Sequence, residues 1–255
     1  MLSLKTFNRF QAFGLHVLIS ACLVAFCYVL VFFIWYPGLT AYASNVSDIF
    51  LMLLLVDVVI GPIITLVIYN PQKKELKRDL RIIGLLQMLA LLYGLHTVFI
   101  VRPVYIVFNA GQFDLTYANQ ISEKNMALVS SDDFRFLPLF GPKLVSVNLP
   151  TDPKLLTPII LASFQGGDDI QVMPQYFVAY MKQKSAILAS IKPLEDLIIL
   201  NRDRAQQISI LINKYQGGDL NAGYIPLKGK SQNLTVIVSR TTGVILEMSD
   251  LKPWP

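Results

Sequence analysis

The sequence has little charge, little cysteine and little histidine. Charged residues make up 15% of the 255 residues, whereas an ordinary soluble domain is about 25% charged. Hydrophobic residues make up 54% and are gathered in long runs. This composition excludes intrinsic disorder, collagen-like repeats and a disulfide-rich scaffold, and it argues against a fully soluble protein.

Both cysteines and both histidines lie before residue 102. Cys22 and Cys27 share one apolar run, and on a helix their side chains point in different directions, which prevents a disulfide bond between them. His16 and His96 lie in the first and third apolar runs. The chain beyond residue 102 therefore lacks a cysteine nucleophile, a Ser-His-Asp triad and a typical zinc site.

Three apolar runs are each long enough to cross a bilayer as a helix. They cover residues 12–35, 49–69 and 82–101, and a spanning helix needs about 20 residues. No comparable run follows Arg102. The sequence therefore predicts a three-helix transmembrane region at residues 1–102, in contact with membrane lipids, and an extramembrane domain at residues 103–255.

Lysine and arginine are distributed unevenly around these runs. The N-terminal tail holds Lys5 and Arg9, and the loop at 37–48 holds no cation. The next loop holds five: Lys73, Lys74, Lys77, Arg78 and Arg81. Because positively charged loops stay in the cytoplasm, we expect a cytoplasmic N-terminus and an extracytoplasmic C-terminal domain. Most of the net charge of +5 is this orientation signal, so it gives no support for nucleic-acid binding.

One short motif after the first run permits a different N-terminus. Ala41-Tyr42-Ala43 resembles a signal-peptidase site, although the apolar run before it is longer than a usual signal peptide. Cleavage after Ala43 stays open from the sequence. It would not change the side of the membrane on which the C-terminal domain lies.

The C-terminal domain has the pattern of a small α+β fold. Two hairpins are expected, one pairing residues 104–108 with 113–117 and one pairing 234–239 with 244–248. Between them we expect helices at 152–164, 185–191 and 194–215, with Pro158 inside the first. The glycine pairs Gly166-Gly167 and Gly217-Gly218 are typical of helix stops.

A single carboxylate lies inside the second apolar run. Asp57 in hydrocarbon costs about 2.5–3.5 kcal/mol on insertion scales, so we expect it to have a partner or to be neutral. At a rise of about 1.5 Å per residue, Tyr93 lies at a similar depth and His96 about one turn higher, and we expect Asp57 to pair with one of them. Gly61-Pro62 is expected to free backbone groups and kink the helix.

This polar cluster permits three interpretations. It is an internal clasp between the three helices, a notch that receives a partner transmembrane helix, or part of a proton pathway. Elsewhere the sequence predicts no catalytic residue, metal site or cofactor site. The remaining carboxylate pairs, Asp132-Asp133, Asp168-Asp169 and Glu195-Asp196, are typical of solvated loops and helix starts, and no phosphate-binding glycine loop is present.

Several motifs resemble the type IV pilin accessory proteins of the TfpX/TfpZ kind. Residues 57–66 read DVVIGPIITL and precede Tyr69-Asn70-Pro71 and a lysine-rich turn. The similarity continues in Arg102-Pro103-Val104-Tyr105, in MPQYFV at 173–178, in GYIPLKG at 223–229, in Thr242-Gly243 and in DLKPW at 250–254. It covers nearly the whole chain. The resemblance implies an inner-membrane protein of a Gram-negative bacterium that helps type IV pilins enter or persist in the assembly pathway, and it supplies no catalytic residue.

From this resemblance we expect a non-enzymatic accessory protein or chaperone that binds the major pilin. The groove near Asp57 would hold the apolar pilin helix. The outer domain would contact the pilin head through Tyr176, Phe177 and Tyr180 or through hairpin edges, although these aromatic side chains equally suit the core. The alternatives are a membrane-anchored sensor of an extracytoplasmic ligand and a pilin-modifying enzyme.

Overall fold

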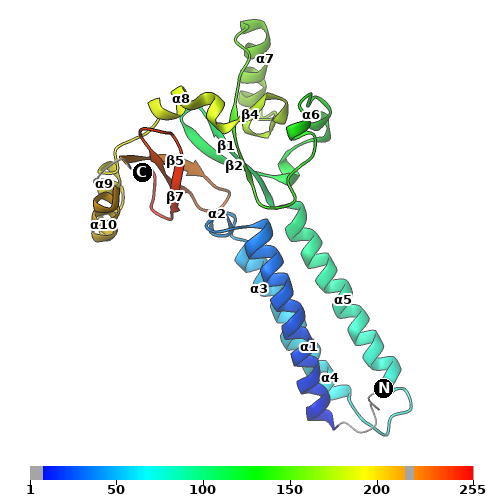
Figure 1. Cartoon of the computed structure of the whole chain (residues 1–255). Coiled ribbons are helices and arrows are strands. Elements are labelled where there is room, and N and C mark those ends of the chain that lie inside the picture. The colour runs from blue at the N-terminus through cyan, green and yellow to red at the C-terminus, as the bar shows by residue number, and fades with distance from the viewer. Residues whose placement is uncertain (1–7, 216–220, 255) are drawn as a thin grey trace. The chain divides into compact units, whose positions relative to one another are not determined.

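The chain divides into two compact units (Figure 1), and the computed structural model describes residues 8–215 and 221–254. The first unit contains the chain up to Ile34 together with Asn45–Ile100, and the second contains Trp35–Ser44 together with the chain from Val101 onward. The sequence groups Trp35–Ser44 with residues 1–102, as the end of the first apolar run and the outward-facing loop after it, whereas the structure groups this segment with the second unit.

Hydrogen bonds explain why Trp35–Ser44 joins the second unit. The carbonyl oxygen of Ala43 accepts from the backbone N–H groups of Ser231 at 2.9 Å and Gln232 at 3.3 Å. The Ala43 side chain is fully buried in a core cluster of that unit. Within the segment lies the short helix α2 (Thr40–Ser44).

Three apolar helices in the first unit are long enough to cross a membrane, as predicted. They cover Arg9–Trp35, Val46–Ile68 and Leu76–Ile100. The first consists of α1 (Arg9–Val29) and the π-helical η2 (Leu30–Trp35), and Asn8 and Gln11 cap its start reciprocally. The third is the single helix α5 (Leu76–Ile100).

The second apolar helix changes its winding around Asp57. It consists of α3 (Val46–Leu54), the π-helical turn η3 (Leu55–Ile60) and α4 (Gly61–Ile68). The irregularity expected at Gly61-Pro62 thus takes the form of a π-helical turn directly before the glycine. Such turns occur frequently at functional sites.

The second unit is built on one curled sheet of seven described strands in the order β4-β3-β1-β2-β5-β6-β7. Its strands are β1 (Pro103–Asn109), β2 (Gln112–Tyr117), β3 (Lys143–Val147), β4 (Phe177–Ala179), β5 (Ala222–Lys228), β6 (Leu234–Ser239) and β7 (Ile245–Ser249). The pairs β1–β3 and β2–β5 are parallel, and the other neighbours are antiparallel.

Both predicted hairpins are confirmed. Strands β1 and β2 are joined by Ala110 and Gly111, whose φ angles of 48° and 83° are those of a type I′ turn. Strands β6 and β7 are joined by a loop in which Gly243 has φ 79°. The central strands β3 and β5 were not predicted.

The helices of the second unit agree in part with the sequence expectation. Helix α7 (Pro153–Phe164) is confirmed, with Asp152 as its N-cap and Gly166 in the left-handed conformation at its end. Helix α8 (Lys184–Ala189) is shorter than expected, and α6 (Glu123–Ala127) is additional. The 3₁₀ turns are η4 (Ala118–Gln120), η5 (Asp132–Phe134), η6 (Ile170–Val172), η7 (Pro174–Tyr176) and η8 (Tyr180–Gln183). Lys5, Gly217 and Gly218 lie outside the described residues.

The expectation of one continuous helix at 194–215 is wrong. The segment forms α9 (Asp196–Leu200), η9 (Arg202–Arg204) and α10 (Ala205–Tyr215), and Figure 1 shows α9 and α10 at one side of the sheet. The helix breaks at Asn201, whose φ of −135° and ψ of 60° are not helical. Hydrogen bonds from the Asn201 side chain to the backbone of Lys252 hold this break.

Alternating side chains of the strands build the core on both faces of the sheet. One face carries a continuous cluster that includes Ile106, Phe113 and Ile225. On the other face, Tyr105 and Val107 belong to a second cluster, which also contains Phe134 and Phe177. A third cluster packs α9 and α10 against β5 and β6. The opposite face of β2 is polar, because it carries the buried Asp114 and Thr116.

Candidate functional site

Asp57 is a buried carboxylic acid among the apolar helices. It lies in the π-helical turn η3 and is 5% exposed. Its Oδ2 atom is buried and has no hydrogen-bond partner among the described residues. A buried polar atom without a partner is rare in proteins and is especially costly in hydrocarbon, which makes this carboxyl group the starting point of a candidate site.

The backbone around Asp57 explains why the helix is irregular here. The N–H of Gly61 bonds to the carbonyl oxygen of Val56, five residues back. The next residue, Pro62, has no N–H, so the carbonyl oxygen of Asp57 lacks a donor in its own helix. The side chain of Gln87 in α5 supplies that donor, from Nε2 at 3.3 Å.

Gly61 makes the approach of Gln87 possible. A Cβ atom at this position would lie 1.8 Å from Gln87 Nε2 and 2.4 Å from its Cδ. Only glycine leaves this space free. The motif Gly61-Pro62 therefore removes a main-chain donor and also admits the side chain that replaces it.

A second polar contact joins the first and second apolar helices. His16 Nδ1 and Thr65 Oγ1 are 2.6 Å apart. Polar contacts of this kind commonly connect helices in membranes. The internal connections of the unit thus run through His16, Thr65 and Gln87, and the Asp57 carboxyl oxygen Oδ2 takes no part in them.

A cavity of about 160 Å³ borders Asp57. Its polar lining consists of His16, Ser20, Asp57 and Gln87, and its apolar lining consists of Ile19, Leu23, Gly84, Met88 and Leu91. Ile19 and Met88 are exposed on the outside of the helices, so the cavity lies at the surface of the first unit and opens between α1 and α5. The arrangement offers an incoming group one unpaired carboxyl oxygen in an otherwise apolar place.

Tyr93 and His96 do not pair with Asp57, contrary to expectation. Tyr93 is 74% exposed, and His96 is exposed as well. The buried side of α5 carries Ile83 and Leu91, and Tyr93 lies about 200° around the helix from Leu91. The α5 residue that contacts Asp57 is Gln87, six residues before Tyr93, so the depth estimate pointed to a position too far along α5 and on the wrong face.

Of the five predicted membrane residues, the structure brings together Asp57, Gly61 and Pro62, all of which are buried. Sequence reasoning missed Gln87, Ser20 and Thr65 as members of the site and interpreted His16 as structural. The helical spacing of Ile83, Gln87 and Leu91 is a signal that could have found Gln87.

The aromatic side chains predicted to contact a partner do not form a surface. Phe177 and Tyr180 are 4% and 7% exposed and belong to two core clusters. The Tyr180 hydroxyl donates to the carbonyl oxygen of Gly243 at 2.8 Å. Tyr176 is half-buried against one of these clusters. These side chains therefore belong to the interior, where they pack β4 and the residues beside it against the rest of the second unit.

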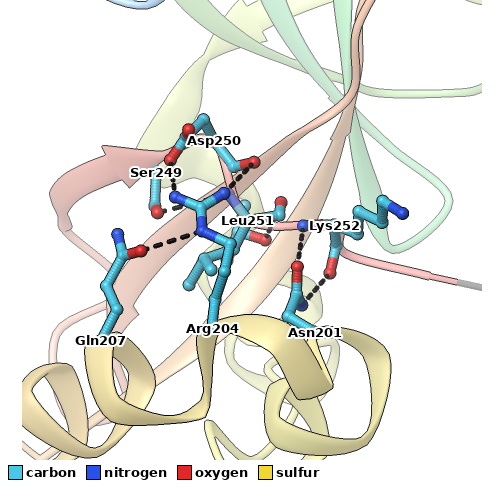
Figure 2. A network of polar contacts seen from close by, with 8 residues as sticks. Asn201, Arg204, Gln207, Ser249, Asp250, Leu251 and Lys252 are labelled. Carbon is cyan, nitrogen blue, oxygen red and sulfur yellow. Dashed lines mark hydrogen bonds and ion pairs between the residues drawn. The ribbon is translucent and has the colours of Figure 1, made fainter.

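The C-terminal motif at 250–254 is a structural element of the second unit. Figure 2 shows Arg204 between Gln207 and Asp250, and Arg204 Nη2 lies 2.7 Å from Asp250 Oδ1. Asn201 donates to the Lys252 carbonyl oxygen at 3.0 Å and accepts from its N–H at 2.8 Å. A polar cavity of about 430 Å³ borders this network. The Arg204–Asp250 ion pair and the Asn201–Lys252 hydrogen bonds indicate that the motif fixes this segment against α9 and α10.

Across residues 8–215 and 221–254, no cluster of three or more His, Cys, Asp or Glu side chains has an arrangement that could hold a metal ion. The two cysteines in this part of the chain are free thiols, with Cys22 exposed and Cys27 buried. The unpaired carboxyl group beside a small cavity remains the most distinctive chemical feature of the described chain.

Comparison with known proteins identifies the family. The family model of the fimbrial assembly protein FimB matches residues 5–38. The fimbrial assembly proteins of serogroups I and E1 from Dichelobacter nodosus are each 29% identical over 248 residues, which cover 93% of this chain and 95% of each relative. The protein of serogroups C1 and C2 from the same organism is 35% identical over 97 residues, 37% of this chain and 74% of the relative. No solved structure matches the chain significantly. The chain therefore belongs to the fimbrial assembly protein family, and the resemblance to type IV pilin accessory proteins is confirmed.

Proposed function

We propose that this protein is a non-enzymatic accessory or chaperone protein of type IV pilus biogenesis, and that the cavity at Asp57 receives the transmembrane helix of a pilin subunit. Family membership supports the first part, because the relatives are named fimbrial assembly proteins. The observation that carries the second part is the buried Asp57 Oδ2, which has no hydrogen-bond partner among residues 8–215 and 221–254.

Energetics favour a partner contact over a clasp. A carboxylate in hydrocarbon costs about 2.5–3.5 kcal/mol on insertion scales. The clasp between the helices uses the Asp57 carbonyl oxygen and the His16–Thr65 contact instead of Oδ2. A hydrogen-bond donor or cation carried by a neighbouring helix would lower the cost of Asp57, and this gain makes the contact selective for helices with such a group.

The two units suit a client that has both a membrane helix and a head outside the membrane. We propose that the first unit lies in the bacterial inner membrane with its N-terminus in the cytoplasm, and that the second unit lies in the periplasm. Two linked contacts, one in each compartment, would raise the effective concentration of each contact for the other.

This orientation has a direct test. In a variant without native cysteines, a membrane-impermeant maleimide applied to spheroplasts should label Phe164→Cys in α7 and should not label Lys74→Cys in the basic loop. Both original side chains are exposed. Labelling of position 74 alone would show the opposite orientation and contradict the proposal.

Photo-crosslinking in cells that produce the cognate pilin tests the binding site. A photoreactive residue at Met88, beside the cavity, should capture pilin, whereas the same residue at Tyr93 on the opposite face of α5 should not. Replacing Asp57→Asn should lower both the capture at position 88 and the number of pili, at a normal level of the accessory protein. Equal capture at positions 88 and 93, or no capture at either, would contradict the proposed site.

A further inference from the structure

Three large apolar side chains are exposed in the loop between η5 and β3. Phe136, Leu139 and Phe140 are 80%, 54% and 81% exposed. Leu137, between them in the chain, packs instead into the core cluster that contains Phe134. The loop is therefore anchored at its base while three apolar side chains point outward, and a concentration of exposed apolar surface marks a contact with a protein or a membrane.

A buried arginine binds this loop to the chain segment that follows the third apolar helix. Arg102 is 5% exposed and donates from Nε at 3.2 Å and from Nη2 at 3.1 Å to the carbonyl oxygen of Pro138. Only Val101 separates Arg102 from Ile100, where α5 ends. Two residues of extended chain cover about 7 Å. The covalent chain thus keeps Arg102, and the loop bound to it, close to the point at which α5 leaves the membrane.

The segment that follows the first apolar helix also lies near Arg102. Tyr36 directly follows Trp35, where that helix ends, and Tyr36 is buried in the second unit. Burial raises the pKa of the Tyr36 hydroxyl, and the nearby Arg102 guanidinium acts in the opposite direction. The segments that follow the first and the third apolar helices therefore meet, within the second unit, at the arginine that holds the loop.

The charges around the loop suit a lipid surface. Residues 136–142 contain no acidic side chain, and they are flanked by Lys143 and by Arg135, whose Nη2 lies 3.0 Å from Asp132 Oδ1. Lys143 Nζ lies 4.8 Å from the centroid of the Phe134 ring, at the base of the loop. An apolar tip with cations beside it matches the acyl chains and the anionic headgroups of a bacterial membrane.

We propose that Phe136, Leu139 and Phe140 insert into the interface of the bilayer leaflet on the side of the second unit. The loop anchors this unit to the membrane surface in addition to the chain crossings, and it limits the directions in which the unit tilts. The proposal is independent of the pilin site at Asp57, because it concerns lipid and a different unit of the chain.

Spin labelling of the full chain measures the predicted insertion. A nitroxide is placed at Phe136→Cys, Phe140→Cys or Phe164→Cys in a background with Cys22→Ser and Cys27→Ala, and the protein is reconstituted in vesicles of phosphatidylethanolamine and phosphatidylglycerol. Phe164 is the matched control, because it is an 85% exposed phenylalanine of the same unit in α7. The readout is the collision rate of each label with oxygen, which concentrates in lipid, relative to a water-soluble nickel chelate.

We expect the ratio of oxygen to nickel collisions to be several-fold higher at positions 136 and 140 than at position 164. Equal ratios at the three positions would overturn the proposal and would assign the exposed side chains to a protein partner instead. All three labels replace exposed side chains, and a normal melting temperature of each labelled protein shows that the fold is kept.

Discussion

At the residue scale, two buried carboxyl groups show how position determines their chemistry. Asp57 is buried between apolar helices, with one oxygen unpartnered among the described residues. Asp114 is buried on the polar face of β2, where Gln112 Nε2 donates to its Oδ1 at 2.9 Å. Burial raises the pKa of Asp114 to about 6, against the smaller opposing effects of Gln112 and Lys228, and Asp169 adds to the increase. Asp114 therefore titrates near neutrality in the folded protein.

The raised pKa of Asp114 predicts a pH-dependent stability of the second unit. The folded unit binds the Asp114 proton more tightly than the unfolded chain, so the contribution of this group to stability is largest below about pH 4 and is lost as the pH rises through about 6. At a shift of about two pKa units the loss is on the order of 3 kcal/mol. Replacing Asp114→Asn should therefore raise the melting temperature at about pH 8 and leave it nearly unchanged at about pH 4.

Thermal unfolding of the full chain in nanodiscs at the two pH values measures this effect. The exposed Asp133 provides the control, since Asp133→Asn should leave the difference between the two pH values as in the unchanged protein. A melting temperature that Asp114→Asn does not raise at the higher pH would show that the carboxylate is tolerated without cost.

At the element scale, the π-helical turn η3 and the start of α4 together create a binding place for the Gln87 side chain. Pro62 leaves the Asp57 carbonyl oxygen without a main-chain donor, and Gly61 leaves room for Gln87 to supply one. Because lipid offers no water to bond such a group, the helix depends on a side chain from its neighbour. The irregular winding therefore couples the second apolar helix to the third.

Replacing Gly61→Ala should break this coupling. The added Cβ overlaps the end of the Gln87 side chain, which moves away and leaves the Asp57 carbonyl oxygen unbonded. We expect a loss of about 1–3 kcal/mol in the free energy of unfolding of the first unit. Gly14→Ala in α1 is the matched control, because nothing lies within 4 Å of a Cβ at that position. A melting temperature of Gly61→Ala equal to that of the control would show that the contact between Gln87 and the Asp57 carbonyl oxygen does not stabilise the first unit.

At the scale of the whole molecule, the chain crosses between its two units three times. The segment Trp35–Ser44 leaves the first unit, enters the core of the second and returns. Ala43 is fully buried there, and its carbonyl oxygen bonds the loop between β5 and β6. The second unit is therefore incomplete without a segment that precedes it by almost sixty residues in the sequence.

The burial of Ala43 predicts that a larger side chain at this position destabilises the second unit. Replacing Ala43→Leu adds volume to a closed core and should lower the free energy of unfolding of the second unit by about 1–3 kcal/mol. The same exchange at the exposed Ala189 at the end of α8 should change it by less than about 0.5 kcal/mol. Chemical unfolding followed by circular dichroism separates the outcomes, and equal effects of the two exchanges would show that Trp35–Ser44 does not belong to the folded core.

Local patterns of the sequence predicted much of the fold. Long apolar runs are sufficient to find the three membrane helices, and the turn residues Asn109-Ala110-Gly111 are sufficient to find the first hairpin. The break at Asn201 was missed because its cause lies about fifty residues away, in hydrogen bonds with Lys252. Strand β3 was missed because its pairing partners β1 and β4 are likewise remote in sequence. Strand β5 was missed although its antiparallel partner β6 follows it directly, because Gly223 and Pro226 are unusual inside a strand.

The same division applies to the candidate site. The sequence by itself determined that one acid and a Gly-Pro pair lie in an apolar helix, because hydrocarbon makes such residues conspicuous. Only the tertiary structure decided which groups face Asp57, because depth along a helix leaves rotation about its axis undetermined. That rotation directs Gln87 toward Asp57 and Tyr93 away from it. It also leaves Asp57 Oδ2, at the edge of the cavity, without a partner in the part of the chain that the structure describes.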